Sequence, residues 1–281
     1  MIIKNLLTKN FFYRFNNTSL FSQFVADIFE KIFDKKKIDL YLPYENRPFQ
    51  NAIINSVKKM SNGNKTFAYL HNLPWPFQAD MIYKNKNIDT LYVCSNLQKQ
   101  KLINYYDWSK NKIKTTSSLR YSKLSSRKST IFLPYEINNE EIYLSNLLLL
   151  FKEKKFCNIN LNISIHPLKK NNKKHIEFKN VLKKSIAKIK DINKYKIKIF
   201  NSILIGAPGG AAAECLQTTG KIFHITINKY DVFSLKIWTN IKVKNFSKYM
   251  YEYTLIKKIN FIDLAHKKNN LKEKILNESK K

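Results

Sequence analysis

Residues 203–227 read ILIGAPGGAAAECLQTTGKIFHITI, and this stretch decides the fold of the chain. An apolar run at 203–205 predicts a buried strand, and the alanine-rich run at 211–216 predicts a helix. Gly220 ends that helix, and a second apolar run at 222–227 predicts another strand. Four of the five glycines in the chain fall here, namely Gly206, Gly209, Gly210 and Gly220. We therefore expect a strand, a glycine turn, a helix and a parallel strand.

The glycine turn is also a candidate binding site. A helix that begins directly after glycines exposes backbone N–H groups, which favour an anionic ligand such as a phosphate. The pattern is neither GxGxxG nor a Walker motif, so the motif alone does not identify a nucleotide site. The alternative interpretation is a tight strand–helix corner whose glycines serve packing only.

The same alternation of strand and helix runs through most of the chain. The first 37 residues are amphipathic and predict helical structure. Further strands are predicted at 38–42, 66–70, 90–94, 130–134 and 160–165, and helices at 49–60, 96–106, 140–154 and 176–189. Repeated strand–helix units indicate an α/β fold with parallel sheets covered by helices.

One stretch interrupts this alternation. Residues 108–129 are polar, basic and rich in serine, and we interpret them as a linker between two domains. The prediction is a partial N-terminal Rossmann-like domain at 1–107 and a complete C-terminal Rossmann-like domain at 130–271. The last residues, 272–281, form a basic tail.

Composition limits the function classes. The chain has 281 residues, 44% of them apolar, and a net charge of +31. A charge of this size invites a nucleic-acid partner, but only four of the 51 basic residues are arginine, the residue that reads bases and phosphates bidentately. We therefore expect no nucleic-acid partner and assign the lysines to solvated faces. Attraction to acidic lipid headgroups still follows from the charge.

Cysteine usage and hydropathy indicate the compartment. The three cysteines, Cys94, Cys157 and Cys215, are widely spaced and contain no CxxC pair. This pattern favours neither a disulfide framework nor a zinc site, and a reducing cytoplasmic setting is expected. No apolar run approaches the length of a membrane span.

Polar residues follow several of the predicted strands. Glu45, His71 and His166 each come just after an apolar strand, as does Gly206. In open α/β sheets ligands bind beyond the carboxyl ends of the strands, so these residues are the candidates for chemistry. The plain alternatives are an ion pair of Glu45 with Arg47 and loop-stabilising roles for both histidines. The remaining histidines are interpreted as structural or surface residues, His224 inside a strand and His175 and His266 among lysines and asparagines.

Three passages resemble the GT-B glycosyltransferases of bacterial surface-carbohydrate synthesis. YLPYENRPFQNAIINSVKK followed by FAYLHN is similar to that group's glutamate–asparagine loop and to its strand that ends in histidine. NISIHP resembles the His-Pro motif of bacterial sialyltransferases and glycerophosphate transferases, and GAPGGAAAECLQTTGKIFHI resembles the donor segment of GT-B enzymes. The segment departs from that pattern because it offers no serine or threonine hydroxyl among its glycines, and the first domain is short.

The resemblance implies two Rossmann-like domains that face each other across a cleft, the first truncated. It also implies roles for particular residues. The donor phosphates would lie against His166 and Pro167 and against the glycine segment, and Glu214 would contact the donor's sugar or ribose. Glu45 and His71 would lie on the acceptor side and take the acceptor's proton. The donor-side set comprises His166, Pro167, Gly206, Gly209, Gly210, Ala211, Ala212 and Glu214.

The function expected from this resemblance is transfer of a sugar or sugar acid from a nucleotide donor to a surface glycan or lipid-linked acceptor. No Asp-x-Asp motif occurs, so no metal is expected, and no cofactor beyond the nucleotide-sugar substrate. The enzyme would be cytoplasmic and peripheral at the inner face of the membrane. Two alternatives stay open: a related epimerase or glycerophosphotransferase, and a non-catalytic basic protein that binds nucleic acid or anionic surfaces.

Overall fold

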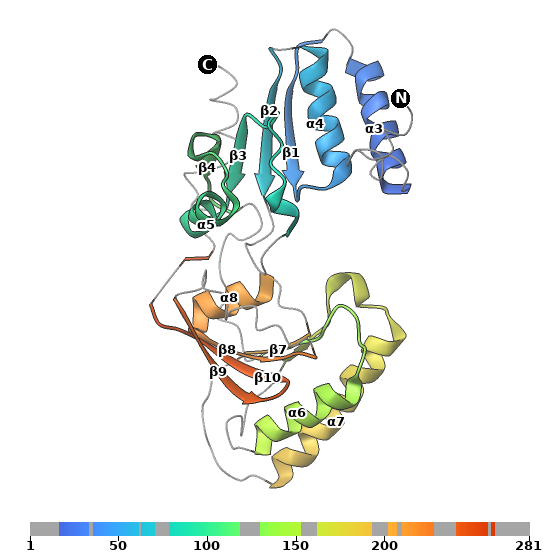
Figure 1. Cartoon of the computed structure of the whole chain (residues 1–281). Coiled ribbons are helices and arrows are strands. Elements are labelled where there is room, and N and C mark those ends of the chain that lie inside the picture. The colour runs from blue at the N-terminus through green and yellow to red at the C-terminus, as the bar shows by residue number, and fades with distance from the viewer. Residues whose placement is uncertain are drawn as a thin grey trace, which may run out of the picture. The chain divides into compact units, whose positions relative to one another are not determined.

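The computed structural model has two compact units, one containing the elements from α3 to β4 and the other those from β5 to β10 (Figure 1). Both are built from parallel strands and helices, which confirms the predicted α/β class. The structure describes residues 17–33, 36–61, 63–70, 79–118, 130–152, 162–192, 202–206, 210–227, 240–257 and 260–261.

The first unit contains a four-stranded sheet in the order β1-β2-β3-β4, with every pair parallel. Pro43 lies within β1, which is at the edge of the sheet, the position where proline is tolerated in a strand. The elements are α3 (Asn17–Phe33), β1 (Asp39–Tyr44), α4 (Pro48–Met60), β2 (Lys65–Leu70), η1 (Ala79–Ile82), β3 (Thr90–Val93), α5 (Asn96–Tyr106), η2 (Lys110–Lys112) and β4 (Ile113–Thr115).

The fourth strand corrects the predicted linker at 108–129. β4 lies inside that stretch and pairs with β3, and Trp108 and Ile113 are both buried in the core of this unit. A three-residue strand with a single apolar position carries too little periodicity to be recognised in a serine- and lysine-rich context. The first sheet therefore continues beyond the boundary predicted at residue 107.

The second unit contains a six-stranded sheet in the order β6-β5-β7-β8-β10-β9. The first four strands are parallel, and α8 lies on the opposite side of the sheet from α6 and α7 (Figure 1). The elements are β5 (Thr130–Phe132), α6 (Glu140–Lys152), β6 (Asn162–Ser164), η3 (Pro167–Lys169), α7 (Lys173–Ile192), β7 (Ser202–Ile205), α8 (Gly210–Thr219), β8 (Lys221–Ile225), β9 (Ile241–Ser247) and β10 (Met250–Leu255).

Sequence reasoning missed the last two strands. β9 and β10 form an antiparallel hairpin that extends the parallel sheet, and β10 pairs with β8. The sequence places this segment in the second domain but predicts no strand in it. Apolar or aromatic residues alternate with polar residues over part of both strands, but the lysines of β9 and the tyrosines of β10 weaken the contrast between the two faces. In β9 only Ile241 is fully buried.

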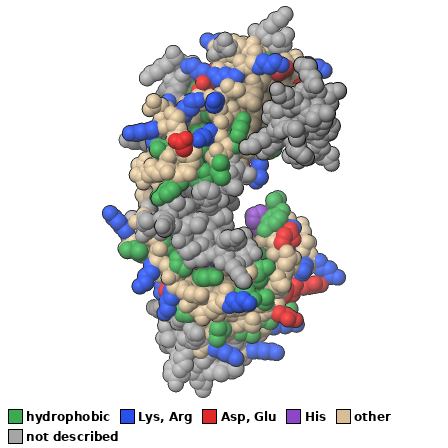
Figure 2. All heavy atoms as spheres, in the orientation of Figure 1, with side chains coloured by type: hydrophobic (Ala, Val, Ile, Leu, Met, Phe, Trp, Pro, Cys, Tyr) green, Lys and Arg blue, Asp and Glu red, His purple; other side chains and the backbone are tan. Residues whose placement is uncertain are grey.

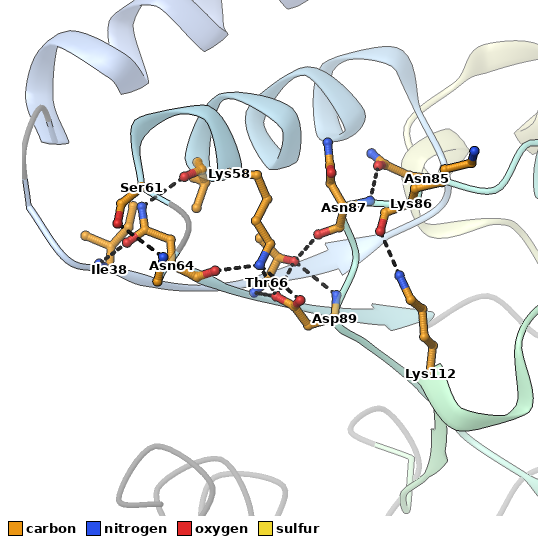
Figure 3. A network of polar contacts seen from close by, with 12 residues as sticks. Ile38, Lys58, Ser61, Asn64, Thr66, Asn85, Lys86, Asn87, Asp89 and Lys112 are labelled. Carbon is orange, nitrogen blue, oxygen red and sulfur yellow. Dashed lines mark hydrogen bonds and ion pairs between the residues drawn. The ribbon is translucent and has the colours of Figure 1, made fainter.

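A polar network holds the amino-terminal ends of β2 and β3 together (Figure 3). The Asp89 carboxylate accepts from the Thr66 backbone N–H at 2.7 Å and lies 2.7 Å from the Lys58 ammonium. Lys58 Nζ also donates to the Asn64 carbonyl at 2.6 Å, and the fully buried Asn64 side chain accepts from the Ile38 N–H. The network joins β1, α4, β2 and the loop before β3.

The ionised form of Asp89 is favoured in this network. Partial burial raises the pKa of the Asp89 carboxyl. The hydrogen bond and positive charge of Lys58, together with the Thr66 N–H, lower this pKa by more than burial raises it, so the pKa lies below its usual value. Because the folded-state pKa is lowered, the carboxylate stabilises the fold above its unfolded-state pKa. That contribution is lost as the pH falls through the folded-state pKa.

We predict that Asp89→Asn lowers the free energy of unfolding at neutral pH by about 1–2 kcal/mol, the scale of a charge-assisted hydrogen bond. Urea denaturation at a series of pH values measures the difference. The difference from wild type should shrink below about pH 4, where the wild-type carboxylate becomes protonated. The control Asp39→Asn changes an exposed carboxylate and should leave stability almost unchanged. A difference for Asp89→Asn that does not depend on pH would contradict this role.

Candidate functional site

The second sheet has a topological switch point between β5 and β7. From β5 the chain passes through α6 to β6 on one side, whereas from β7 it passes through α8 to β8 on the other. The crevice for ligands in an open α/β sheet lies where the direction of winding reverses, outside the carboxyl ends of the strands. Gly206, which follows β7, and Pro134, which follows β5, therefore border the expected binding crevice.

Gly206 is required at this point by two independent constraints. Its backbone has φ +83°, a left-handed conformation that side chains rarely adopt. A Cβ atom built there would lie 2.5 Å from Cβ of Pro134, so the glycine also permits close contact between the ends of β7 and β5. The Gly206 N–H donates to the Ile225 carbonyl at 2.8 Å, which ties the turn to β8.

His224 holds the backbone carbonyl of Gly206. Its Nε2 hydrogen-bonds to the Gly206 carbonyl, and its Nδ1 lies 2.9 Å from the Tyr253 hydroxyl. Because a carbonyl only accepts, Nε2 carries the proton, and Nδ1 accepts from Tyr253. Complete burial lowers the pKa of His224 to about 4, outweighing the opposing effect of the bond to Gly206. The ring is therefore neutral at neutral pH, and it is structural, as expected from its place in the strand.

Helix α8 begins at Gly210, after this turn. Gly210 and Ala211 are half-buried, and Ala212 is completely buried, so only small side chains separate the start of the helix from its surroundings. No acidic residue occupies the first turn, which leaves its backbone dipole available to an anion. The structure thus places Gly206 and the start of α8 at one corner, while Gly209 lies outside the described residues. Glu214 is 4% exposed, so its expected contact with a sugar stays a prediction.

His166 belongs to a second cluster, beyond the end of β6. Its ring contacts Tyr135 edge-on, with centroids 5.1 Å apart, and Lys169 Nζ lies 4.4 Å from the Tyr135 ring centre. Lys169 also pairs with Glu136 at 2.6 Å. His166 Nδ1 accepts from the Leu168 N–H at 3.3 Å, and Pro167 begins the η3 turn that follows. In the neutral ring the proton is therefore on Nε2, where it is available to a ligand.

The strand order separates His166 from the glycine corner. β5 lies between β6 and β7, so His166 and Gly206 follow strands about 10 Å apart, twice the spacing of neighbouring strands. The sequence predicts that His166 and the backbone amides of residues 209–212 contact the same phosphate. The chain crosses back over β5 between β6 and β7, so that shared contact would have to extend across the end of β5, and it stays a prediction. Tyr135 occupies the intervening position and contacts His166 directly.

Glu45, a candidate residue of the first unit, lies in the loop after β1. Glu45 forms an ion pair with Arg47 at 3.3 Å, as the plain alternative anticipated. Between them Asn46 adopts φ 61°, and its buried side chain accepts from the Tyr44 hydroxyl at 2.6 Å and donates to the Tyr83 carbonyl. A left-handed asparagine held by buried hydrogen bonds fixes the direction of this loop. His71 lies outside the described residues.

His175 is not the surface residue that its lysine-rich context indicated. Its side chain is 2% exposed, and Nε2 lies 3.0 Å from the Pro134 carbonyl. Asn172 caps α7 and lies 3.0 Å from the other ring nitrogen. His175 therefore joins α7 to the end of β5, beside the switch point. The spacing of His175, Phe178 and Leu182 on one helical face could have revealed its burial.

Two features are absent from the described residues. No group of three or more histidine, cysteine, aspartate or glutamate side chains lies together in a way that would hold a metal ion. None of the described helices is both long enough and apolar enough to cross a membrane. Basic side chains are spread over the face shown in Figure 2 rather than gathered in one patch.

Comparison with solved structures finds similarity at low sequence identity. The chain resembles the crystal structure of a glycosyltransferase from Rickettsia africae ESF-5, with 15% sequence identity and a TM-score of 0.36, over 80% of this chain and 68% of that chain. A likeness at this score carries no argument about function. No family model and no curated protein sequence matches the chain.

We predict that Gly206→Ala lowers the free energy of unfolding by about 3 kcal/mol, because it adds a clash with Pro134 to the strain of a left-handed backbone. Gly220→Ala is the matched control. Gly220 has φ +70° but no atom within 4 Å of the added methyl, so only the backbone strain of about 1 kcal/mol applies. Urea denaturation measures both values, and equal losses would show that contact with Pro134 is not a constraint.

Proposed function

We propose that the protein is a glycosyltransferase that moves a sugar or sugar acid from a nucleotide donor to a glycan or lipid-linked acceptor. The observation that carries this proposal is the glycine corner at the switch point, where Gly206 leads into helix α8. This is the place at which an open α/β sheet binds a nucleotide ligand. The resemblance of residues 206–225 to a GT-B donor segment supports the same assignment.

The donor phosphates would bind at the start of α8. Backbone N–H groups of Gly210, Ala211 and Ala212 have no partner within the helix, and their dipoles favour negative charge. The negative charge on the phosphate grows as the sugar leaves, so fixed N–H donors stabilise the transition state more than the ground state. Gly206 and His224 contribute indirectly by fixing the corner from which the helix starts.

His166 and Tyr135 would contact a more distant part of the donor. Both follow the carboxyl ends of parallel strands of the same sheet, Tyr135 after β5, which is next to β7, and His166 after β6, which is two strands from β7. A nucleotide sugar is long enough to reach from the start of α8 across the end of β5. The Nε2 proton of His166 would then donate to a phosphate oxygen at the far end of the diphosphate.

On the acceptor side, Glu45 would take the proton of the acceptor hydroxyl, with His71 as the other candidate. Glu45 Oε2 lies 3.3 Å from Arg47 Nε, and a carboxylate is a common general base. This assignment completes a reaction in which no protein group becomes covalently linked to the sugar. The enzyme would act in the cytoplasm, at the inner face of a membrane that holds its acceptor.

We predict that Gly210→Val abolishes binding of the nucleotide sugar while leaving the fold intact, since a β-branched side chain blocks approach to the first N–H groups of α8. Thermal unfolding with a panel of nucleotide sugars identifies the donor by its stabilisation of the wild-type protein. Gly63→Val is the control, because Gly63 lies in an exposed turn where an added Cβ would meet the Ser61 hydroxyl at 3.6 Å, an ordinary contact distance.

Two outcomes of this test would contradict the proposed function. One is undiminished stabilisation of Gly210→Val by the donor. The other is the absence of any stabilising nucleotide sugar together with salt-sensitive binding to mixed oligonucleotides, which would favour a basic nucleic-acid-binding protein.

We predict that His166→Ala slows sugar transfer by on the order of a hundredfold, the scale for one lost donor at a developing charge. Stability should change little, because the side chain is exposed. The turnover number with the nucleotide sugar that stabilises the wild-type protein measures the effect on transfer. Urea denaturation measures the effect on stability. A loss of stability with normal turnover would instead assign His166 only to the η3 turn that it caps.

A further inference from the structure

A groove of about 420 Å³ lies beside the edge of the second sheet, away from the glycine corner. It runs between the end of β6, which is the outermost strand of the sheet, and helix α7. Its lining is two isoleucines, three lysines and one asparagine: Ile165, Lys170, Ile176, Lys179, Asn180 and Lys183.

The periodicity of α7 creates this lining. His175, Phe178 and Leu182 are buried on one face of the helix. Ile176, Lys179 and Lys183 recur at intervals of three and four residues, so they form a neighbouring stripe that borders the groove. The helix carries seven lysines and two acidic residues over its whole length. The groove is therefore an apolar floor bordered by positive charge.

The positive charge of the groove is not balanced within the described part of the chain. No described carboxylate forms an ion pair with Lys170, Lys179 or Lys183. Two acidic residues of the same unit are engaged with other lysines, Glu177 with Lys173 at 3.9 Å and Glu136 with Lys169 at 2.6 Å. Three like charges around one groove repel one another, and an anionic ligand would relieve that repulsion.

The apolar residues near the groove identify the kind of anion. Ile176 is 42% exposed, and Leu168, in the η3 turn between Ile165 and Lys170, is 78% exposed. Exposed aliphatic side chains surrounded by lysines are typical of surfaces that lie on a bilayer, with the apolar groups at the acyl boundary and the ammonium groups at the headgroups. None of the six lining residues is aromatic, so the groove lacks the stacking surface that single-stranded nucleic acids use.

We propose that this groove binds the phosphate of an anionic phospholipid, so that the η3 turn and α7 form a membrane-contact surface. Lys170, Lys179 and Lys183 neutralise the headgroup phosphate, and Leu168 enters the boundary between headgroups and acyl chains. This surface adjoins His166, which caps the η3 turn, but the three groove lysines are not among the donor-side residues, and the proposal does not depend on transferase activity. It also differs from the exposed apolar side of α3, which includes Phe24 at 62% exposure.

The test is co-sedimentation of the full chain with vesicles of phosphatidylcholine alone or mixed with phosphatidylglycerol. We expect binding only to the mixed vesicles. The triple variant Lys170→Gln, Lys179→Gln, Lys183→Gln should bind them on the order of a hundredfold more weakly, because each lysine at an anionic surface contributes about fivefold. The control is Lys65→Gln, Lys86→Gln, Lys110→Gln, which removes the same charge from exposed positions of the first unit and should weaken binding much less.

A second pair of variants tests the apolar contact. Leu168→Ser should weaken vesicle binding several-fold, whereas Ile256→Ser, at a residue of the same unit that is 68% exposed, should not. Circular dichroism verifies that every variant is folded. Stabilisation by the donor nucleotide sugar should be the same in the groove variant as in wild type, so failure of this proposal and failure of the transferase proposal are distinguishable.

Four outcomes would overturn the membrane proposal. The wild-type chain could fail to bind mixed vesicles, or both lysine triples could lose equal affinity, which would reflect net charge alone. Binding could persist in the groove variant and be lost in Phe24→Ser, which would assign it to α3. Finally, inorganic phosphate could stabilise the wild-type protein through the three lysines without any vesicle binding, which would make the groove a site for a soluble anion.

Discussion

The contact between Gly206 and Pro134 is the constraint on which the second unit depends. It brings the end of β7 against the end of β5 so closely that no side chain fits between them. His224 and Ile225 then hold the carbonyl and the N–H of the same glycine from β8. One glycine thus joins three neighbouring strands, β5, β7 and β8, where the winding of the sheet reverses.

This constraint also places the candidate chemistry. The turn after Gly206 sends the chain into α8, whose first residues are small and whose first turn has no acidic side chain. On the other side of the switch point, His175 reaches the Pro134 carbonyl and ties α7 to the same corner. Helix α7 in turn presents the lysines of the groove at the outer edge of the sheet. The proposed donor site and the proposed membrane surface would therefore both follow from how the chain is wound around β5.

Much of this fold is readable in the sequence, and the reasons for the failures are specific. The glycine stretch predicted β7, α8 and β8 because glycines and apolar runs are strong local signals. The order β6-β5-β7 has no local signal, so the distance between His166 and Gly206 could not be predicted. β4 was too short to detect, and the lysines of β9 obscured its alternation. The burial of His175 was not predicted, because the lysines and asparagines around it indicated a surface position and its spacing from Phe178 on α7 was not used.

The most direct test of the central claim is amide hydrogen exchange with and without the nucleotide sugar that stabilises the protein most. If the donor phosphates bind at the glycine corner, exchange should slow at the amides of Gly210, Ala211 and Ala212, which have no acceptor within the helix. Slower exchange at Gly206 should not be required, because its N–H is already bonded to Ile225. Protection that appears only in other elements, with these three amides unchanged, would contradict a phosphate site at the start of α8.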